Sequence, residues 1–385
     1  MRVLTAGESH GPQLTAIIEG IPSGLTIDIE KINRVLAERQ QGYGRGGRMK
    51  IETDCVVITS GVRHKKTLGS PITLTIENKN FKQWQKEMAV TQYFPSQRVV
   101  LCPRPGHADL VGGLKRRFID LRQVLERSSA RETAMRVAVG ALCSQLLEAL
   151  NITHYRRVLS IHRAFDPSSV EQFLENPIIN DELGCVTICQ NEFKEAIEDA
   201  IAKKTTVGGI VQTIVTNLPV GLGDYTQWMN KLDARLSYYV MSINAFKGVS
   251  FGDGFELTKQ YGYECMDEIG YDQTFYRYSN HLGGIEGGMT TGAPLVVNGA
   301  MKPIPTQYQP LKTVDILTKT STTASIERSD YCAVPAASVV MEYVIVTALA
   351  EVILSTFDGS CLERLQEQID TYRKETAYGK NNFTE

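Results

Sequence analysis

The sequence lacks the features that would place this chain in several broad classes of protein. No Pro/Ser-rich linker, low-complexity tract or short-period repeat divides its 385 residues. One large domain over residues 1–370, followed by a polar tail at 371–385, is therefore expected. The first residues reach glycine and polar side chains within a few positions, which argues against a secretory signal and favours a cytoplasmic protein. The late apolar stretch from Cys332 to Phe357 is interrupted by Glu342 and Glu351, so we expect a buried helix rather than a membrane span.

Paired cysteines and a strong net charge are also absent. The eight cysteines are scattered, and the closest pair, Cys185 and Cys189, lacks nearby histidines or a second pair at metal-ligand spacing. Free thiols and no metal site are expected. The formal net charge of -2 gives no global field that would attract nucleic acid. One stretch differs, because nine Lys or Arg accompany only four Asp or Glu between residues 98 and 136. This local excess indicates a small anionic ligand.

Hydrophobic periodicity predicts a mixture of helices and strands. Asp28 is placed to cap a helix through about Gln40, and residues 120–150 predict one long helix, or two joined near Ser128. In a continuous helix Arg127 and Arg131 would share a face. Further helices are expected at 191–204 and 338–357, and strands at 55–60, 72–76, 158–161 and 210–216. The alternation indicates mixed α and β structure, with the chemistry in the glycine-rich loops between elements.

Two of the six histidines lie next to glycine in polar loops. His10 stands in the sequence GESHG after a short apolar strand, which favours display of the ring on a tight turn. His107 stands in RPGHAD, beside Arg104 and Asp109. A lone histidine is more often structural than catalytic, so neither segment decides its role by itself.

Arginine and glycine mark three other loops. Residues 39–48 carry Arg39, Arg45 and Arg48 around a glycine-rich turn, which is typical of a solvated loop, of a small-anion site or of an RGG-like nucleic-acid segment. Residues 283–290 hold four glycines in six positions, which fits a backbone pressed against a flat ligand. Arg328 and Asp330 precede the apolar late helix and form a pairing that is common on surfaces.

Together and in this order, these segments resemble the chorismate synthase family. The segments are GESHG, RQQGYGRGGRM, RPGHADLVGG, LERSSARET, SINAFKGV with GDGF, GGIEGGMTTG, MKPIPT, and ERSD ahead of PAA. The similarity spans residues 1 to about 355, and eight ordered motifs are specific where any single one is weak. Departures are minor: Gln41 stands where glycine is usual, His281 where a second asparagine is frequent, and Thr291 in place of asparagine.

The resemblance implies a single large α+β domain with a β-α-β sandwich, assembled as a homotetramer. It also implies a lyase of the shikimate pathway to aromatic amino acids, which eliminates phosphate from 5-enolpyruvylshikimate 3-phosphate to give chorismate. The anti-1,4 elimination requires reduced FMN (FMNH2) but has no net redox change. No GxGxxG follows a strand, which favours a separate NAD(P)H-dependent flavin reductase, with NADP as its product, as partner.

The resemblance also assigns candidate site residues. The catalytic candidates are His10 as general acid to the phosphate, His107 as the residue that sets the protonation of reduced FMN, and Asp330 as an aid to ring-proton transfer. The candidates for substrate binding are arginines, namely Arg39, Arg45, Arg48, Arg104 and Arg131. The candidates for the cofactor are Arg127, Ser128, Ser129, Asn244, Ala245, Gly287, Lys302, Pro303, Ile304, Pro305, Thr306 and Arg328.

Two rival functions remain at this point. An RNA- or polyanion-binding protein would use the 39–48 loop and the basic stretch, but the net charge is near neutral and aromatics do not interleave with the basic residues. Neither nucleic acid nor membrane is therefore an expected partner. A flavoenzyme with net oxidation or reduction is the second rival.

Overall fold

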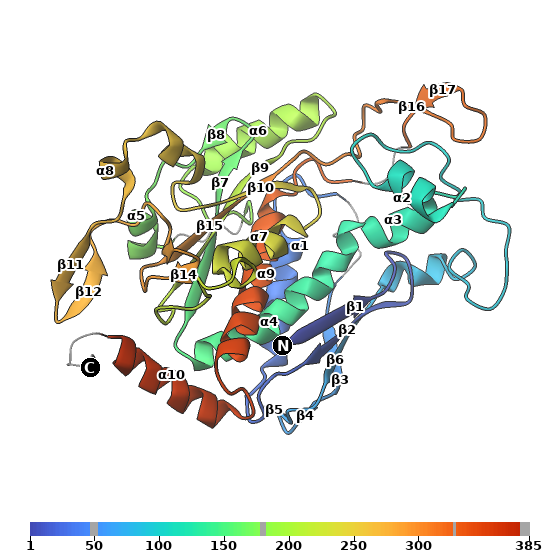
Figure 1. Cartoon of the computed structure of the whole chain (residues 1–385). Helices are drawn as coiled ribbons and strands as arrows, with labels where there is room; N and C mark the ends of the chain where they lie inside the picture. The colour runs from blue at the N-terminus through green and yellow to red at the C-terminus, as the bar shows by residue number, and fades with distance from the viewer. Residues whose placement is uncertain (47–52, 178–181, 326–328, 378–385) are drawn as a thin grey trace.

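A computed structural model describes residues 1–46, 53–177, 182–325 and 329–377, so the predicted site residues Arg48 and Arg328 lie outside it. Two antiparallel sheets enclose a layer of helices (Figure 1). The first sheet has the order β1-β2-β6-β3 and consists of β1 (Arg2–Ala6), β2 (Gln13–Glu19), β6 (Ile72–Glu77) and β3 (Val56–Ser60). The second has the order β10-β15-β9-β7-β8 and consists of β10 (Phe246–Phe251), β15 (Leu295–Met301), β9 (Gly209–Thr216), β7 (Thr153–Ile161) and β8 (Ala164–Phe165).

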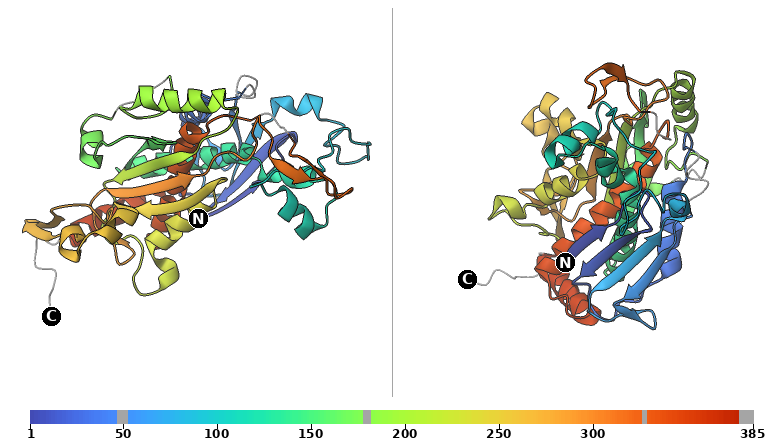
Figure 2. Two further views of the ribbon diagram at one scale, coloured as in Figure 1. Left: turned by 90° about the horizontal axis from the view of Figure 1, so that it is seen from above. Right: turned by 90° about the vertical axis from the view of Figure 1, so that its right-hand side faces the viewer.

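The central layer is built on α4 (Thr133–Ala149) and α9 (Val334–Thr356), which pack against each other. Helix α4 contacts β2 and β6 of the first sheet, whereas α9 contacts β7 and β9 of the second. Figure 2 shows the same order of layers from two further directions. Sheet, helices and sheet thus form the β-α-β sandwich that was expected, with one continuous hydrophobic core.

Short elements complete the fold around this sandwich. The remaining helices are α1 (Ile29–Gln40), α2 (Asp109–Arg116), α3 (Arg122–Ser128), α5 (Val170–Glu175), α6 (Gln190–Ala202), α7 (Leu232–Met241), α8 (Gly262–Cys265) and α10 (Leu362–Thr376). Single 3-10 turns are η2 (Lys79–Gln83), η3 (Ala130–Glu132), η4 (Trp228–Asn230) and η5 (Gly254–Lys259). Two-stranded hairpins are β4 (Val62–Arg63) with β5 (Lys66–Thr67), β11 (Ile269–Asp272) with β12 (Thr274–Arg277), β13 (Ile285–Glu286) with β14 (Met289–Thr290), and β16 (Lys312–Val314) with β17 (Ser321–Thr323).

The cap and the apolar face of α1 confirm the prediction for residues 28–40. The Asp28 carboxylate accepts a hydrogen bond from the Lys31 amide, and Ile32, Val35 and Leu36 are buried on one side. At the end of the helix Arg39 is buried as well, since α1 lies against α4 and α9. The guanidinium group of Arg39 therefore lies in the protein interior.

The helical stretch 120–150 is two helices, α3 and α4, joined near Ser128. Ser129 adopts extended backbone angles, and its hydroxyl accepts from the Arg131 amide to start η3. This break overturns the alternative of one continuous helix, in which Arg127 and Arg131 would share a face. Arg127 is instead exposed and donates to the carbonyl oxygens of Thr5 and Gly7, whereas Arg131 is buried.

Helix α9 is buried on every side. It is the one described helix that is long and apolar enough to cross a membrane, and 89% of its most apolar window is buried inside the protein. Glu342 in its middle accepts from Arg156 at 2.9 Å and from His154 at 2.7 Å. Because this carboxylate is paired, the helix fits a protein core, as the sequence predicts.

Two further expectations concern the tail and the thiols. The boundary predicted at residue 371 falls within α10, which continues through Thr376. Leu365 and Ile369 are buried, and Arg373 donates to the carbonyl oxygens of Leu150 and Asn217, which holds this helix to the body. All eight cysteines are free, as expected.

Candidate active site

His10 is buried in a pocket of residues that are distant in sequence. Glu126 on α3 forms two hydrogen bonds with His10: Oε2 accepts from the His10 amide at 2.8 Å, and Oε1 contacts Nδ1 at 2.8 Å. The Trp84 ring stacks on the imidazole with centroids 3.8 Å apart. His10 lies on a turn, as the sequence predicts, but its exposed fraction is only 9%, so the ring is buried and not displayed. The ring is buried by a tertiary contact, because the loop after β1 is hydrogen-bonded to α3 through Ser9 and Glu126.

The Glu126 carboxylate is kept ionised beside this imidazole. Burial alone would raise its pKa, but the hydrogen bonds and charge of His10, together with Arg122, outweigh burial and lower the pKa. An ionised carboxylate only accepts hydrogen bonds, so Nδ1 of His10 must carry a hydrogen. The other ring nitrogen, Nε2, is then the one available to a ligand.

Arg39 and Arg131 converge on one buried carboxylate, Asp54. Arg131 Nη1 lies 2.7 Å from both Asp54 oxygens, and Arg39 Nη1 lies 3.8 Å from Oδ2. Arg131 also donates to Asn78, whose amide group holds the carbonyl oxygens of Glu8 and Gly11. The arginines are thus fixed to the loop that carries His10. Among the residues that the structure describes, Arg131 Nη2 has no hydrogen-bond partner.

These cations lie close enough to oppose one another. Burial, together with the charges of Arg45 and Arg131, lowers the pKa of Arg39 to about 10, although Asp54 and Asp330 act to raise it. Three guanidinium groups therefore face one region that holds two carboxylates. An added anion with several oxygens would relieve this repulsion.

Arg45 is held by Asp330, which joins two loops far apart in sequence. Arg45 Nη1 lies 3.3 Å from Asp330 Oδ2, and the Gly46 amide donates to Oδ1 at 2.6 Å. A side chain at Gly46 would place its Cβ 2.7 Å from the Ser329 carbonyl oxygen, so glycine is required for this approach. The expected site residues Arg45 and Asp330 are thus brought together.

A second cluster surrounds His107. Asp109 at the start of α2 accepts from Arg104 Nε at 2.8 Å and contacts His107 Nδ1 at 2.6 Å, while Arg104 Nη1 donates to the Thr306 hydroxyl. Burial would raise the pKa of Asp109, but the hydrogen bonds from His107 and Arg104 hold it well below its usual range. Arg104, His107 and Thr306 therefore form one rigid group.

The turn at Asn244 and Ala245 lies between the two clusters. Asn244 Nδ2 donates to the Ser128 carbonyl oxygen beside the first cluster, and the Ala245 carbonyl accepts from the Lys302 amide beside the second. Ala245 has a φ of 70°, which is rare for a residue with a side chain. Burial, followed by the charge of Lys247, lowers the pKa of Lys302. Residues predicted for the cofactor thus border both clusters.

Other predicted cofactor residues are placed less directly. The segment Pro303, Ile304 and Pro305 connects Lys302 with Thr306, and the Ile304 carbonyl accepts from Thr206. Ser129 contacts Ser9 through its hydroxyl at 3.1 Å. Gly287 is an exposed turn residue between β13 and β14, and no hydrogen bond connects it with either cluster within the described ranges.

Four residues of the first cluster were not predicted as site residues. They are Asp54, Asn78, Trp84 and Glu126. Glu126 lies inside the LERSSARET segment, and Asp54 follows the arginine-rich loop. Both residues could therefore have been found from the motif that contains or precedes them. Asn78 and Trp84 had none, because only the tertiary fold brings them to His10.

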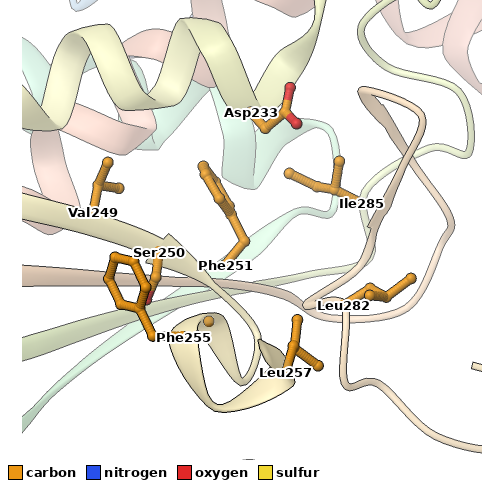
Figure 3. Close-up of a pocket in the computed structure, with 9 residues that line it drawn as sticks. Asp233, Val249, Ser250, Phe251, Phe255, Leu257, Leu282 and Ile285 are labelled. Carbon is orange, nitrogen blue, oxygen red and sulfur yellow. The ribbon is translucent and has the colours of Figure 1, made fainter. Parts of the chain in front are cut away.

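A separate cavity of about 310 Å³ lies on the far side of β10, between α7 and η5. Figure 3 shows its lining, which is largely apolar and includes Phe251, Leu282 and Ile285, with Asp233 at its edge. None of its residues belongs to the two histidine clusters.

No group of three or more His, Cys, Asp or Glu suited to a metal ion occurs in the part of the chain that is described.

Comparisons with known proteins agree on one family. The family model described as chorismate synthase matches residues 1–354. A curated chorismate synthase of Staphylococcus aureus (strain JH9) is 51% identical over 383 residues, which cover 97% of this chain and 99% of the relative. Another from S. aureus (strain bovine RF122 / ET3-1) is 51% identical over 378 residues, covering 96% and 97%. A crystal structure of chorismate synthase superposes with a TM-score of 0.77 at 37% identity, covering 98% of each chain.

Proposed function

Because the chain belongs to the chorismate synthase family and is a lyase that eliminates phosphate from 5-enolpyruvylshikimate 3-phosphate to give chorismate, we propose how its own side chains perform this reaction. The observation that carries the proposal is the convergence of Arg39, Arg45 and Arg131, a cluster that is joined through Asn78 to the loop that carries His10. The substrate has a phosphate and two carboxylates, and a buried set of guanidinium groups is suited to such an anion.

The arginines bind the substrate, and the carboxylates keep them in place until it arrives. Asp54 orients Arg39 and Arg131, and Asp330 orients Arg45. Arg131 Nη2, which lacks a partner among the described residues, is a donor ready for a phosphate or carboxylate oxygen. Arg48 belongs to the same proposal from the sequence and lies outside the described residues.

His10 gives a proton to the departing phosphate from Nε2. The Glu126 carboxylate on Nδ1 stabilises the protonated ring, and Trp84 keeps the ring in one plane. Protonation of the leaving group lowers the cost of breaking the carbon–oxygen bond, which is the usual benefit of a general acid. Asp330 lies across the arginine cluster and assists removal of the ring proton.

The residues at the turn between the clusters fit reduced FMN. Lys302 offers a cation, Ser128, Ser129 and Thr306 offer hydroxyl groups, and Gly106 keeps the backbone open, since a Cβ there would meet only Lys302 Nζ at 3.9 Å. Bound by these residues, reduced FMN would supply an electron transiently, with no net redox change in the reaction. His107, oriented by Asp109, maintains the working protonation state at this site.

We also propose a cytoplasmic homotetramer that obtains reduced flavin from a separate NAD(P)H-dependent reductase. Exposed aromatic side chains gather on and before the β11–β12 hairpin, as expected of a surface that meets other subunits; they are Tyr261, Tyr263, Tyr271, Phe275 and Tyr278. Light scattering after gel filtration measures the assembly, and a mass of one 42.7 kDa chain contradicts this part of the proposal.

Titration of FMN fluorescence tests the shared site. Because the cofactor residues border the arginine cluster, FMN is expected to bind, and to bind more tightly when 5-enolpyruvylshikimate 3-phosphate is present. Shikimate, which lacks the phosphate and the enolpyruvyl group, is the control and should have a smaller effect. An FMN affinity that saturating substrate leaves unchanged would count against adjacent sites.

A further inference from the structure

A row of polar side chains crosses the second sheet on the face opposite α9. Arg157 of β7, Gln212 of β9, Asn298 of β15 and Ser250 of β10 stand directly opposite one another in register. Arg157 Nε donates to Gln212 Oε1 at 2.7 Å, Gln212 Nε2 donates to Asn298 Oδ1 at 2.8 Å, and Asn298 Nδ2 donates to Ser250 Oγ at 3.3 Å. Alternate residues of a strand point to opposite faces, so Val158, Val211 and Val297 enter the core instead.

Arg157 at the end of this row is a buried cation without an ion pair. Its exposed fraction is 2%, and it forms no salt bridge with a described residue, although the charges of Asp166 and Glu171 act on it. Its guanidinium donates to Gln212, to the Ser168 hydroxyl and to the Ser169 carbonyl oxygen, and it lies 5.1 Å from the Phe173 ring centroid. These contacts use Nε and Nη1, so Nη2 has no protein partner in the described ranges. Burial lowers the pKa of this group, and the charges of Asp166 and Glu171, which raise it, offset that effect only in part.

The row forms the floor of a cavity of about 720 Å³. Its walls are apolar near Leu159, Ile210 and Val296. Carboxylates line both ends: Asp166 and Glu171 near Arg157, and Asp253, which contacts His281 at 2.7 Å, at the far end. The volume lies within the range of about 300–1,000 Å³ that is usual for small-molecule sites. Val249, Ser250 and Phe255, which Figure 3 labels, line both this cavity and the smaller one shown there. No residue of the two histidine clusters lines this cavity.

We propose that this cavity is a second ligand site, which binds a small monocarboxylic acid with an aromatic or aliphatic body. The carboxylate pairs with Arg157, whose planar fork suits two carboxylate oxygens. The body lies along Leu159, Ile210 and Val296. The ligand carboxylate would thus form the direct ion pair that Arg157 does not make with any described carboxylate, although Asp166 and Glu171 lie near enough to raise its pKa.

Calorimetric titration of the whole protein with 3-phenylpropanoate tests this proposal. The wild-type chain should bind the acid and should not bind 3-phenylpropanol, which has the same body without the charge. Arg157→Gln should weaken binding at least tenfold, since it removes the charge-assisted contact. Arg163→Gln, an exposed arginine near the same strand with the same change of net charge, is the matched control and should bind like the wild type.

A second variant keeps the proposal testable if Arg157→Gln does not fold. Ala300→Leu adds bulk to the cavity lining and retains Arg157, so it should also weaken binding, while circular dichroism and Tm report whether it is folded. The proposal is wrong if the wild type does not bind the acid, or if Arg157→Gln binds it equally well. It is also wrong if Arg157→Gln only dissociates the oligomer, because a second copy of the chain would then occupy the cavity.

Discussion

The described arginines of the two histidine clusters are each held by a carboxylate of the protein. Asp54 holds Arg131 and Arg39, Asp109 holds Arg104 and His107, and Asp330 holds Arg45. Long cationic side chains would otherwise lose considerable conformational freedom on binding a ligand. Pairing fixes them in advance, and the surplus of positive charge that remains is available to the substrate.

His10→Ala tests the general acid. Turnover should fall by roughly 10²–10⁴-fold, the usual contribution of general acid catalysis, while the affinities for FMN and substrate change much less. Steady-state kinetics under anaerobic conditions measure turnover, and fluorescence measures FMN binding. A folded variant with wild-type turnover would remove His10 from the mechanism.

Glu126→Gln tests whether the carboxylate behind His10 supports the chemistry or only the fold. The amide retains the shape but loses the charge that stabilises protonated imidazole, so kcat should fall about tenfold or more with little change in KM. Glu132→Gln is the control, because Glu132 is equally buried but pairs with Arg136. Nitrogen NMR of His10 should show that Nδ1 no longer carries its hydrogen uniformly. If Glu126→Gln and Glu132→Gln have equal kcat values, Glu126 has only a structural role.

At the scale of elements, local patterns in the sequence were sufficient to predict the main helices, but they did not predict which residues meet in the site. The apolar spacing and the Asp28 cap predicted α1, and the long apolar run predicted α9. The break at Ser129 was left open, because it depends on a side-chain hydrogen bond and not on periodicity. Glu126 and Trp84 reach His10 from 116 and 74 residues away in sequence, a proximity that no local pattern encodes.

The crossing of α4 and α9 depends on Gly140. A methyl group there would lie 2.5 Å from Tyr343 Cβ, so Gly140→Ala should separate the helices and lower the free energy of unfolding by about 1–3 kcal/mol. Intrinsic helix propensity favours alanine by about 1 kcal/mol, so a loss of stability isolates the packing effect. Gly262→Ala, where a methyl group meets nothing within 4 Å, is the control. Equal urea midpoints for the two variants would contradict this view of the crossing.

At the scale of the whole molecule, buried carboxylates should make stability sensitive to acid. The folded pKa values of Asp109, Glu126 and Glu342 are lowered from ordinary values of 3.8, 4.5 and 4.5. A lowered pKa means that the ionised group stabilises the fold above its ordinary pKa, and that this contribution is lost as pH falls through the folded value. The free energy of unfolding should therefore decrease steadily below about pH 4.5. Urea unfolding at pH 7, 5 and 4 measures it, and a flat profile would show that these pairs contribute nothing.

The same two-sheet sandwich holds two separate sets of buried cations, one beside the histidines and one on the outer face of the second sheet. The first set has carboxylate partners and a family reaction to explain it. The second, at Arg157, has Asp166 and Glu171 nearby but no direct ion pair among the described residues, and it has no place in that reaction. Activity and ligand binding at Arg157 are therefore separable measurements on one protein.

The most direct test is an anaerobic assay of the purified chain with 5-enolpyruvylshikimate 3-phosphate and chemically reduced FMN. Chorismate and inorganic phosphate should form in equal amounts over many turnovers, and the flavin should remain reduced without consumption of further reductant. Oxidised FMN should give no product. Failure to form chorismate, or consumption of one reductant for each product, would contradict the account.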